Sequence, residues 1–246
     1  MFRGSLTPSP AAHRLATLRG ELTGELGTIE IDELKYRVGL TGRLAVGMLP
    51  FSGQDYVAKA FGALTNSYPD LRLMAVPGSY DMLAKALGRG ELDCMLGILR
   101  TPQPYPDLTQ VFLYNEKFTL IARKDHPIHS LAKSIADLKG EKWIVAPHGT
   151  PVRTYFESLF QSVGTPPPAQ TCEILSFSNA ERMVAHSNSI ALLSYSDQLL
   201  EKLPDDLRKV DIDLPKSEVA IGLTRRKQSS SAEILEMFET LLRRYV

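Results

Sequence analysis

Residues 43–100 read RLAVGMLPFSGQDYVAKAFGALTNSYPDLRLMAVPGSYDMLAKALGRGELDCMLGILR. Three short runs in this stretch are almost continuously apolar, at residues 43–49, 71–76 and 93–99. Apolar side chains at helical spacing fill the two intervals between these runs, and Pro and Gly mark each change. The stretch therefore predicts a strand, helix, strand, helix and strand. Apolar strands that alternate with helices are typical of a parallel sheet covered on both faces.

The loops that follow the strands are the expected binding region. In α/β sheets of this kind, small molecules bind beyond the carboxyl ends of the strands, where loops meet helix N-termini. Residues 49–55 and 99–101 occupy such positions. Ser52 is predicted to cap the helix after the first loop, and Ser79 to cap the next helix.

The remaining sequence repeats the α/β pattern. Two strands are predicted at residues 108–114 and 118–123, separated by the polar tripeptide at residues 115–117. A new series of strands and helices follows, in which Thr150 and Pro151 predict one helix start. Ser178 with Glu181 predicts a capping box at another helix.

Two lobes follow from this order. A last strand at residues 219–224 precedes a C-terminal helix that has no third sheet to cover, so we expect it to pack on the first half. The chain then crosses twice between the lobes and leaves a cleft, a preferred place for a small ligand. The expected lobes are residues 42–117 plus 221–246, and residues 118–220.

Residues 1–41 precede the first strand. Ser9 and Pro10 predict the start of a helix there, whose apolar stripe is narrow and consists of Leu15, Leu18, Leu22 and Leu26. A narrow stripe favours packing against another chain as much as against its own domain, with a frayed tail as the alternative.

The composition excludes several classes of protein. With 246 residues, 43% of them apolar and 23% charged, the chain is expected to fold rather than to be disordered. Lys and Arg number 28, as do Asp and Glu, so the formal charge is zero. Because nucleic-acid-binding domains usually carry a basic excess, we do not expect this segment to hold DNA by itself.

Cysteine use and hydropathy indicate the compartment. Cys94 and Cys172 both fall in predicted strands and are interpreted as buried thiols in a reducing environment. The sequence has no apolar run of 18 residues and no apolar signal segment at its N-terminus. We therefore expect a cytoplasmic protein with no membrane partner.

Two helix N-termini supply the main candidates for ligand binding. Ser52 and Gly53 precede a helix of the first lobe, and His148, Gly149 and Thr150 precede a helix of the second. Free amides and the helix dipole favour a carboxylate at such positions, by about 1 to 2 kcal/mol for two helices together. The sequence predicts that Ser52 and Thr150 face one cleft, although Ser52 also has capping alone as an alternative role.

Further candidates come from neighbouring loops. Arg100 and Thr101 follow the third strand, and Phe177 and Ser178 belong to a corresponding loop of the second lobe. Phe177 can stack on an apolar ligand or pack in the core. Arg153 can pair with a carboxylate of the ligand or be an exposed helical Arg.

Signatures of catalysis and of metal or cofactor binding are missing from the sequence. His126 and His129 have a possible metal spacing, but Pro127 lies between them and no acidic or Cys partner has ligand-like spacing. The chain also lacks a nucleophile elbow, a phosphate-binding loop and a dinucleotide fingerprint. We expect no enzyme activity, no cofactor and no metal.

Five segments in a fixed order carry a family resemblance: Gly42 to Gly47, Tyr68 to Leu71, Gly90 to Asp93, Asp125 to Pro127 and Ile190 to Leu193. Together they resemble the effector-binding domain of LysR-type transcriptional regulators over essentially the whole chain. The sequence departs from the family at residues 186–189, where the usual glycine-rich turn is replaced by His-Ser-Asn-Ser.

The resemblance implies two Rossmann-like lobes of the type 2 periplasmic-binding-protein class, joined by two crossover strands. Residues 1–41 would be the end of a winged helix-turn-helix region and a linker helix. The implied function is sensing of a small-molecule effector, with a homo-oligomer (dimer or tetramer) and DNA contact only through a domain that precedes this segment. A solute-binding transport protein and a two-lobe enzyme are the alternatives.

Overall fold

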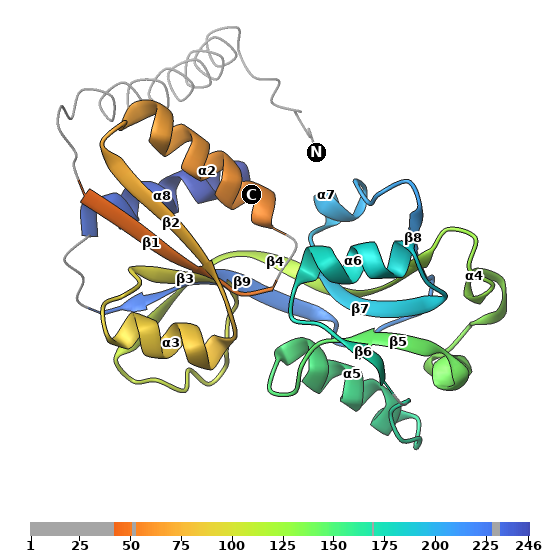
Figure 1. Ribbon diagram of the computed structural model, residues 1–246. Coiled ribbons are helices and arrows are strands. Elements are labelled where there is room, and N and C mark those ends of the chain that lie inside the picture. The colour runs from red at the N-terminus through yellow and green to blue at the C-terminus, as the bar shows by residue number, and fades with distance from the viewer. Residues whose placement is uncertain (1–41, 51–52, 169, 228–231) are drawn as a thin grey trace, which may run out of the picture.

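The computed structural model describes residues 42–50, 53–168, 170–227 and 232–246. The predictions for the N-terminal helix and for Ser52 lie outside these residues. Figure 1 shows two α/β lobes joined near the middle by the long strands β4 and β9. None of the helices in the described ranges is long and apolar enough to cross a membrane.

One mixed sheet of nine strands runs through both lobes of the described chain. Its order is β2-β1-β3-β9-β4-β7-β5-β6, and β8 pairs with β4. The strands are β1 (Gly42–Met48), β2 (Leu71–Pro77), β3 (Cys94–Ile98), β4 (Leu108–Arg123), β5 (Lys142–Val145), β6 (Gln170–Glu173), β7 (Ser189–Tyr195), β8 (Leu207–Lys209) and β9 (Glu218–Arg226).

Helices cover the sheet on both sides. We call lobe I the half with β2, β1 and β3, and lobe II the half with β7, β5, β6 and β8. The helices of lobe I are α2 (Gln54–Ser67), α3 (Tyr80–Gly88) and α8 (Ala232–Tyr245). Lobe II carries α4 (Ile128–Leu131), the 3-10 helix η1 (Ile135–Gly140), α5 (Pro151–Ser162), α6 (Phe177–Ala185) and α7 (Asp197–Leu200).

The predicted strand and helix order of residues 43–100 is confirmed. Strand β1 pairs in parallel with both β2 and β3, and its central residues Leu44, Ala45 and Val46 are fully buried. The predicted return of the C-terminal helix is also confirmed, because α8 packs against α2, with the rings of Phe61 and Phe238 5.5 Å apart.

The predicted break at residues 115–117 is wrong. Strand β4 is continuous and pairs antiparallel with β9 from Leu108 to Lys117. Its polar residues do not interrupt the ladder because they have partners within the strand pair. Glu116 is fully buried and accepts a hydrogen bond from the Tyr114 hydroxyl at 3.1 Å, while the Asn115 side chain donates to Glu218.

The predicted capping box at Ser178 is also wrong. Helix α6 begins at Phe177, and its cap is Ser176, whose hydroxyl accepts from the Asn179 amide at 3.4 Å. Glu181 does not reach back to the helix start because it accepts from the buried Tyr195 hydroxyl at 2.7 Å. A tertiary hydrogen bond therefore replaces the local one that the sequence favours.

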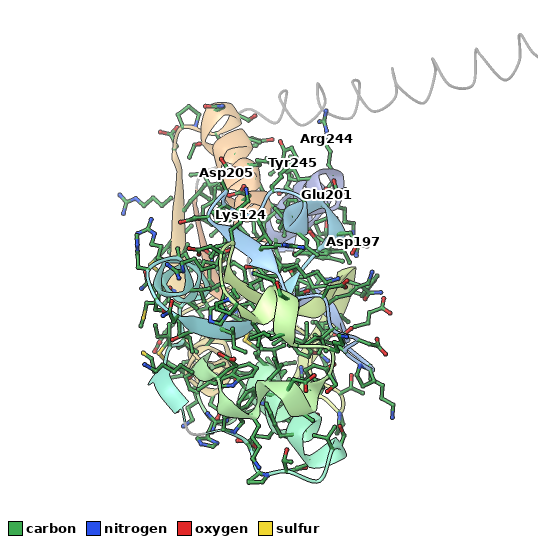
Figure 2. All side chains as sticks on the ribbon, turned by 90° about the vertical axis from the view of Figure 1, so that its right-hand side faces the viewer. Lys124, Asp197, Glu201, Asp205, Arg244 and Tyr245 are labelled. Carbon is green, nitrogen blue, oxygen red and sulfur yellow. The ribbon has the colours of Figure 1, made fainter. Side chains whose placement is uncertain are left out.

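Exposed charged side chains of lobe II lie on α7, in the loop after α7 and directly after β4. Figure 2 views the molecule from the lobe II side and labels four of them, Asp197, Glu201, Asp205 and Lys124. Asp197 pairs with Lys117 at 3.1 Å. Exposed ion pairs of this kind contribute little to stability.

Candidate functional site

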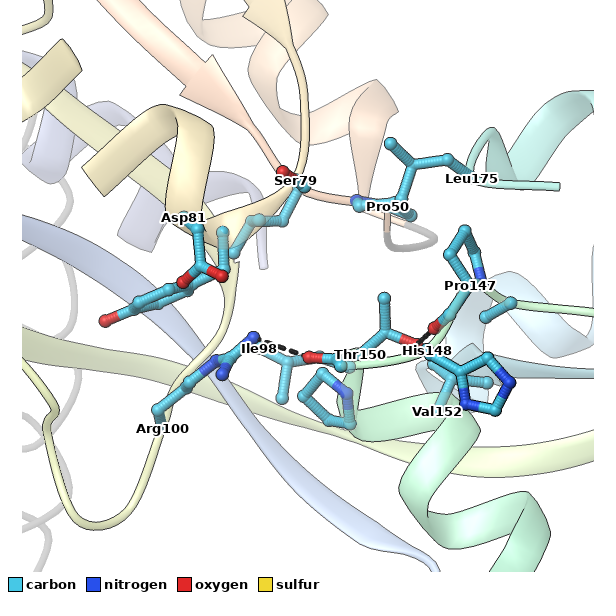
Figure 3. Close-up of a pocket in the computed structure, with 15 residues that line it drawn as sticks. Pro50, Ser79, Asp81, Ile98, Arg100, Pro147, His148, Thr150, Val152 and Leu175 are labelled. Atoms are coloured by element: carbon cyan, nitrogen blue, oxygen red, sulfur yellow. Dashed lines mark hydrogen bonds between the residues drawn. The ribbon is translucent and has the colours of Figure 1, made fainter. Parts of the chain in front are cut away.

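A cavity of about 210 Å³ lies between the two lobes. Figure 3 shows side chains from both lobes around it. Lobe I contributes Leu49, Pro50, Ser79, Tyr80, Asp81, Ile98 and Arg100. Lobe II contributes Ala146, Pro147, His148, Gly149, Thr150, Pro151, Val152 and Leu175.

Two helix N-termini meet at this cavity, one from each lobe. Ser79 is the N-cap residue of α3, and its side chain makes no cap hydrogen bond. Thr150 caps α5: its hydroxyl accepts from the Arg153 amide at 3.2 Å and donates to the Pro147 carbonyl at 2.8 Å. Pro151 at the first helical position removes one amide that would otherwise lack a partner. The positive ends of both helix dipoles therefore favour an anionic group here.

Arg100 brings a full positive charge to the cavity. Its backbone is held on both sides by Gln110, whose side-chain oxygen accepts from the Arg100 amide and whose nitrogen donates to the Arg100 carbonyl, both at 2.9 Å. The guanidinium crosses the cleft, where Nη2 donates to the Gly149 carbonyl at 2.8 Å (Figure 3). Because Gln110 belongs to β4, this strand fixes the position of Arg100.

The Tyr80 ring packs against the guanidinium of Arg100. The guanidinium carbon of Arg100 lies 4.2 Å from the centre of the Tyr80 ring, within cation–π range. The Tyr80 hydroxyl donates to Gln103 Oε1 at 2.8 Å, and its ring stacks on Tyr105. Burial raises the pKa of Tyr80, while the Gln103 hydrogen bond and the Arg100 charge oppose that shift.

Two further hollows adjoin the cavity. One, of about 640 Å³, lies between the N-termini of α2 and α6 and shares Leu49, Pro50 and Leu175 with the cavity. The other, of about 630 Å³, lies on the far side of Arg100, against Tyr155. The cleft therefore has a small central compartment flanked by two wider ones.

The predicted site residues are spread over these three compartments. Arg100, His148, Gly149 and Thr150 line the central cavity, and Thr101 lines the hollow beyond Arg100. Phe177 and Ser178 line the hollow between α2 and α6, where Phe177 is 8% exposed. Gly53 is buried at the start of α2, and Ser52 lies outside the described residues. Contact of these residues with a ligand stays a prediction.

The interpretation of Arg153 as an exposed residue is wrong. Its side chain is 4% exposed and pairs with Glu157 at 2.6 Å. Its Nη2 donates to His148 Nε2 at 3.0 Å, so the guanidinium holds His148 in place at the edge of the cleft. An Arg with these partners is not available to solvent in the way the helical pattern suggests.

Ser79, Tyr80 and Asp81 were missed as site residues. The signal was present, since they follow the Pro77-Gly78 turn at the carboxyl end of the second strand. The rule that favoured Ser52 applies equally to this position.

The two histidines of the His-x-x-His spacing have separate structural roles. His126 Nδ1 accepts from the Ile128 amide at 3.1 Å, and His129 Nε2 lies 2.9 Å from the Arg123 carbonyl. Burial lowers the pKa of His129. No group of three or more His, Cys, Asp or Glu residues in the described ranges is placed to hold a metal ion.

Two α/β lobes on shared crossover strands, with a lined cavity at their junction, define a small-molecule-binding domain of the periplasmic-binding-protein type. Residues 37–246 match the model of the LysR substrate binding domain, and the chain belongs to this family. The two-lobe fold class and the family expected from the sequence are both confirmed.

Related proteins agree with this assignment. The chain is 25% identical over 221 residues to the HTH-type transcriptional regulator GalR of Pseudomonas putida, covering 90% of this chain and 56% of GalR. It thus spans about half the length of the curated relatives it matches first. The fold matches the QuiR effector-binding domain in complex with shikimate (TM-score 0.66, 17% identity, 83% and 97% coverage). It also matches the Synechocystis PCC6803 CcmR regulatory domain in complex with 2-PG (TM-score 0.69, 19% identity, 83% and 97% coverage).

Proposed function

We propose that this chain is the ligand-sensing part of a LysR-type transcriptional regulator. It would bind a small organic anion between the lobes and relay that event to DNA-binding domains. One observation carries the proposal: Arg100 and the N-termini of α3 and α5 converge on a single cavity of about 210 Å³ between the lobes.

The chemistry of the cavity favours an acid. Each helix N-terminus favours an anion by about 0.3 to 1 kcal/mol, and an Arg adds charge-assisted hydrogen bonds. The apolar walls, including Ile98, Val152 and Leu175, suit a compact carbon skeleton. Asp81 shares the lining, so a ligand with a hydroxyl or amino group beside its acid fits better than a dianion.

The relatives support a regulator over the two alternatives. GalR is named as an HTH-type transcriptional regulator, and QuiR holds shikimate, a small organic acid, in its effector-binding domain. A solute-binding protein of a transport system and a two-lobe enzyme share the architecture. GalR, QuiR and CcmR, however, are named as a transcriptional regulator, an effector-binding domain and a regulatory domain. The assignment to a sensor rests on the family, and the site chemistry rests on the cavity.

A thermal-shift screen tests the proposal. Small carboxylic acids and their neutral amides are added in matched pairs to the purified chain. A ligand at one hundred times its dissociation constant stabilises the folded state by about 2.7 kcal/mol. We expect one or more acids, and not their amides, to give such a shift. Binding confined to neutral compounds, or a library without any binder, would contradict the proposal.

Assembly is part of the proposed function. LysR-type regulators are expected to act as dimers or tetramers, and helix α2 and the edge strand β2 are the candidate contact faces here. Strand β2 is an edge of the described sheet, and Met74 on it is 40% exposed. Analytical ultracentrifugation should show a dimer that charged substitutions on β2 dissociate. A monomer at high concentration would remove this part of the proposal.

A further inference from the structure

Arg100 contacts both lobes. Its main chain belongs to lobe I, where it follows β3 and is held by Gln110. Its guanidinium reaches lobe II and donates to the carbonyl of Gly149, two residues before α5 begins. Gly149 lies in the turn that supports the start of α5, so this hydrogen bond links the two lobes at the cavity. A second link lies elsewhere, where the hydroxyls of Tyr56 on α2 and Ser196 before α7 are 3.3 Å apart.

The partners of this guanidinium are neutral. They are the face of the Tyr80 ring at 4.2 Å and the Gly149 carbonyl at 2.8 Å. No carboxylate lies within ion-pair distance of Arg100 in the described part of the chain, and its Nε is buried without a hydrogen-bond partner there. Arg153, which also lies near the cleft, differs because it is paired with Glu157 at 2.6 Å. A guanidinium bonded to a carbonyl exchanges that partner readily for a carboxylate, which binds it more strongly.

We propose that Arg100 is a latch: its hydrogen bond to Gly149 holds the lobes together. An acidic ligand releases this latch when its carboxylate replaces the Gly149 carbonyl as the partner of the guanidinium. This inference deepens the proposed function, because it assumes that the central cavity is the ligand site. Binding of an acid would then free the turn at Gly149 to move with α5. The signal would start as an exchange of hydrogen-bond partners at one side chain.

The geometry explains why Arg is needed at this position. Its planar group lies on Tyr80 and still directs one N–H across the cleft, whereas a Lys ammonium is compact and strongly hydrated. The Tyr80 ring is itself oriented by Gln103, and Gln103 also accepts from the Tyr105 amide at 3.1 Å. The latch is therefore held at three points: its backbone, its stacking surface and its acceptor.

The latch is tested without any ligand by measuring the distance between the lobes. Spin labels are attached to Cys residues introduced at Lys85 on α3 and Gln161 on α5, both exposed, in a Cys172→Ala background. Cys94 is fully buried and needs no change. In the Arg100→Gln variant we expect a longer mean distance and a broader distribution between the labels than in the parent.

Arg43→Gln is the matched control. Arg43 Nη2 donates to the Glu91 carbonyl at 3.1 Å, which is the same kind of bond but lies within lobe I. This variant should leave the distance distribution unchanged. If Arg100→Gln does not fold, Arg100→Lys provides the same test and should also lengthen the distance.

The result separates this inference from the proposed function. Equal distributions for the parent and the Arg100 variants would overturn the latch and leave the ligand proposal intact. A screen without any acidic binder would instead overturn the ligand proposal, whatever the label distances show.

Discussion

The compartment between α3 and α5 and the hollow between α2 and α6 are built alike but differ in charge. At each compartment, one helix N-terminus from lobe I and one from lobe II meet. The first holds Arg100 and Asp81, encloses about 210 Å³ and rests on a stacked pair of Tyr rings. The second is about 640 Å³ in volume, and none of the described residues that line it is charged. Helix termini are therefore a general product of this fold, whereas the placed cation distinguishes one compartment.

The largest effect is expected at the support of α5. Trp143, Phe156 and Phe160 contact one another with ring centres 4.8 to 5.7 Å apart, and all are fully or almost fully buried. Phe156→Ala should destabilise the chain by about 3 to 5 kcal/mol because it leaves a cavity in this cluster. Urea unfolding measures the loss. Ser158→Ala on the exposed side of α5 should change stability by less than about 0.5 kcal/mol, and equal losses would contradict this account of the cluster.

A pair of tryptophan substitutions separates the two compartments. Ser79 and Ala58 are both exposed and line the α3/α5 and the α2/α6 compartment respectively. Ser79→Trp should abolish the ligand-induced stabilisation of about 2.7 kcal/mol seen at one hundred times the dissociation constant, because it fills the smaller cavity. Ala58→Trp should retain it. The reverse pattern in a thermal-shift assay would move the ligand to the other compartment.

The buried ion pair next to the cleft should matter more than a similar pair elsewhere. Arg153 and Glu157 are four residues apart on α5, and the Arg is 4% exposed; Arg243 and Glu239 are four apart on α8, and that Arg is 46% exposed. Glu157→Gln should cost about 1.5 to 3 kcal/mol, since it weakens a charged hydrogen bond to a buried group. Glu239→Gln should cost about 0.3 to 0.5 kcal/mol. Thermal unfolding compares them, and equal costs would show that burial of Arg153 is not decisive.

The smallest predicted difference concerns the two helix caps at the cavity. Thr150 accepts a hydrogen bond from the Arg153 amide, whereas the Ser79 side chain makes no cap bond. Thr150→Ala should therefore destabilise the chain by about 1 kcal/mol, and Ser79→Ala should leave stability nearly unchanged. Denaturant midpoints measured side by side resolve this difference. A larger loss at Ser79 would mean that its hydroxyl caps α3 in solution.

Local sequence signals predicted the elements well where packing agrees with them. The apolar runs of residues 43–100 and the Thr150-Pro151 helix start are examples. They misplaced features decided by distant partners. Glu181 accepts a hydrogen bond from Tyr195 and so does not form the predicted capping box. Arg153 is buried because it donates hydrogen bonds to Glu157 and His148.

The candidate site was predicted in part for the same reason. Arg100 and Thr150 were identified because strand ends and helix starts are visible in the sequence. Which helix of lobe I would face Thr150 depends on how the lobes dock, and no local pattern encodes that. In the described residues, Thr150 shares its cavity with Ser79 and the start of α3.

The sheet order also sets the sequence in which the two lobes can be completed during synthesis. Strand β3 has β9 as its neighbour on one side, and α2 is covered by α8, although more than one hundred residues separate these partners. A ribosome therefore releases β1, α2, β2, α3 and β3 long before the elements that close them. Lobe II, drawn from a continuous segment, can assemble first, and the earliest-made part of the described chain finishes folding last.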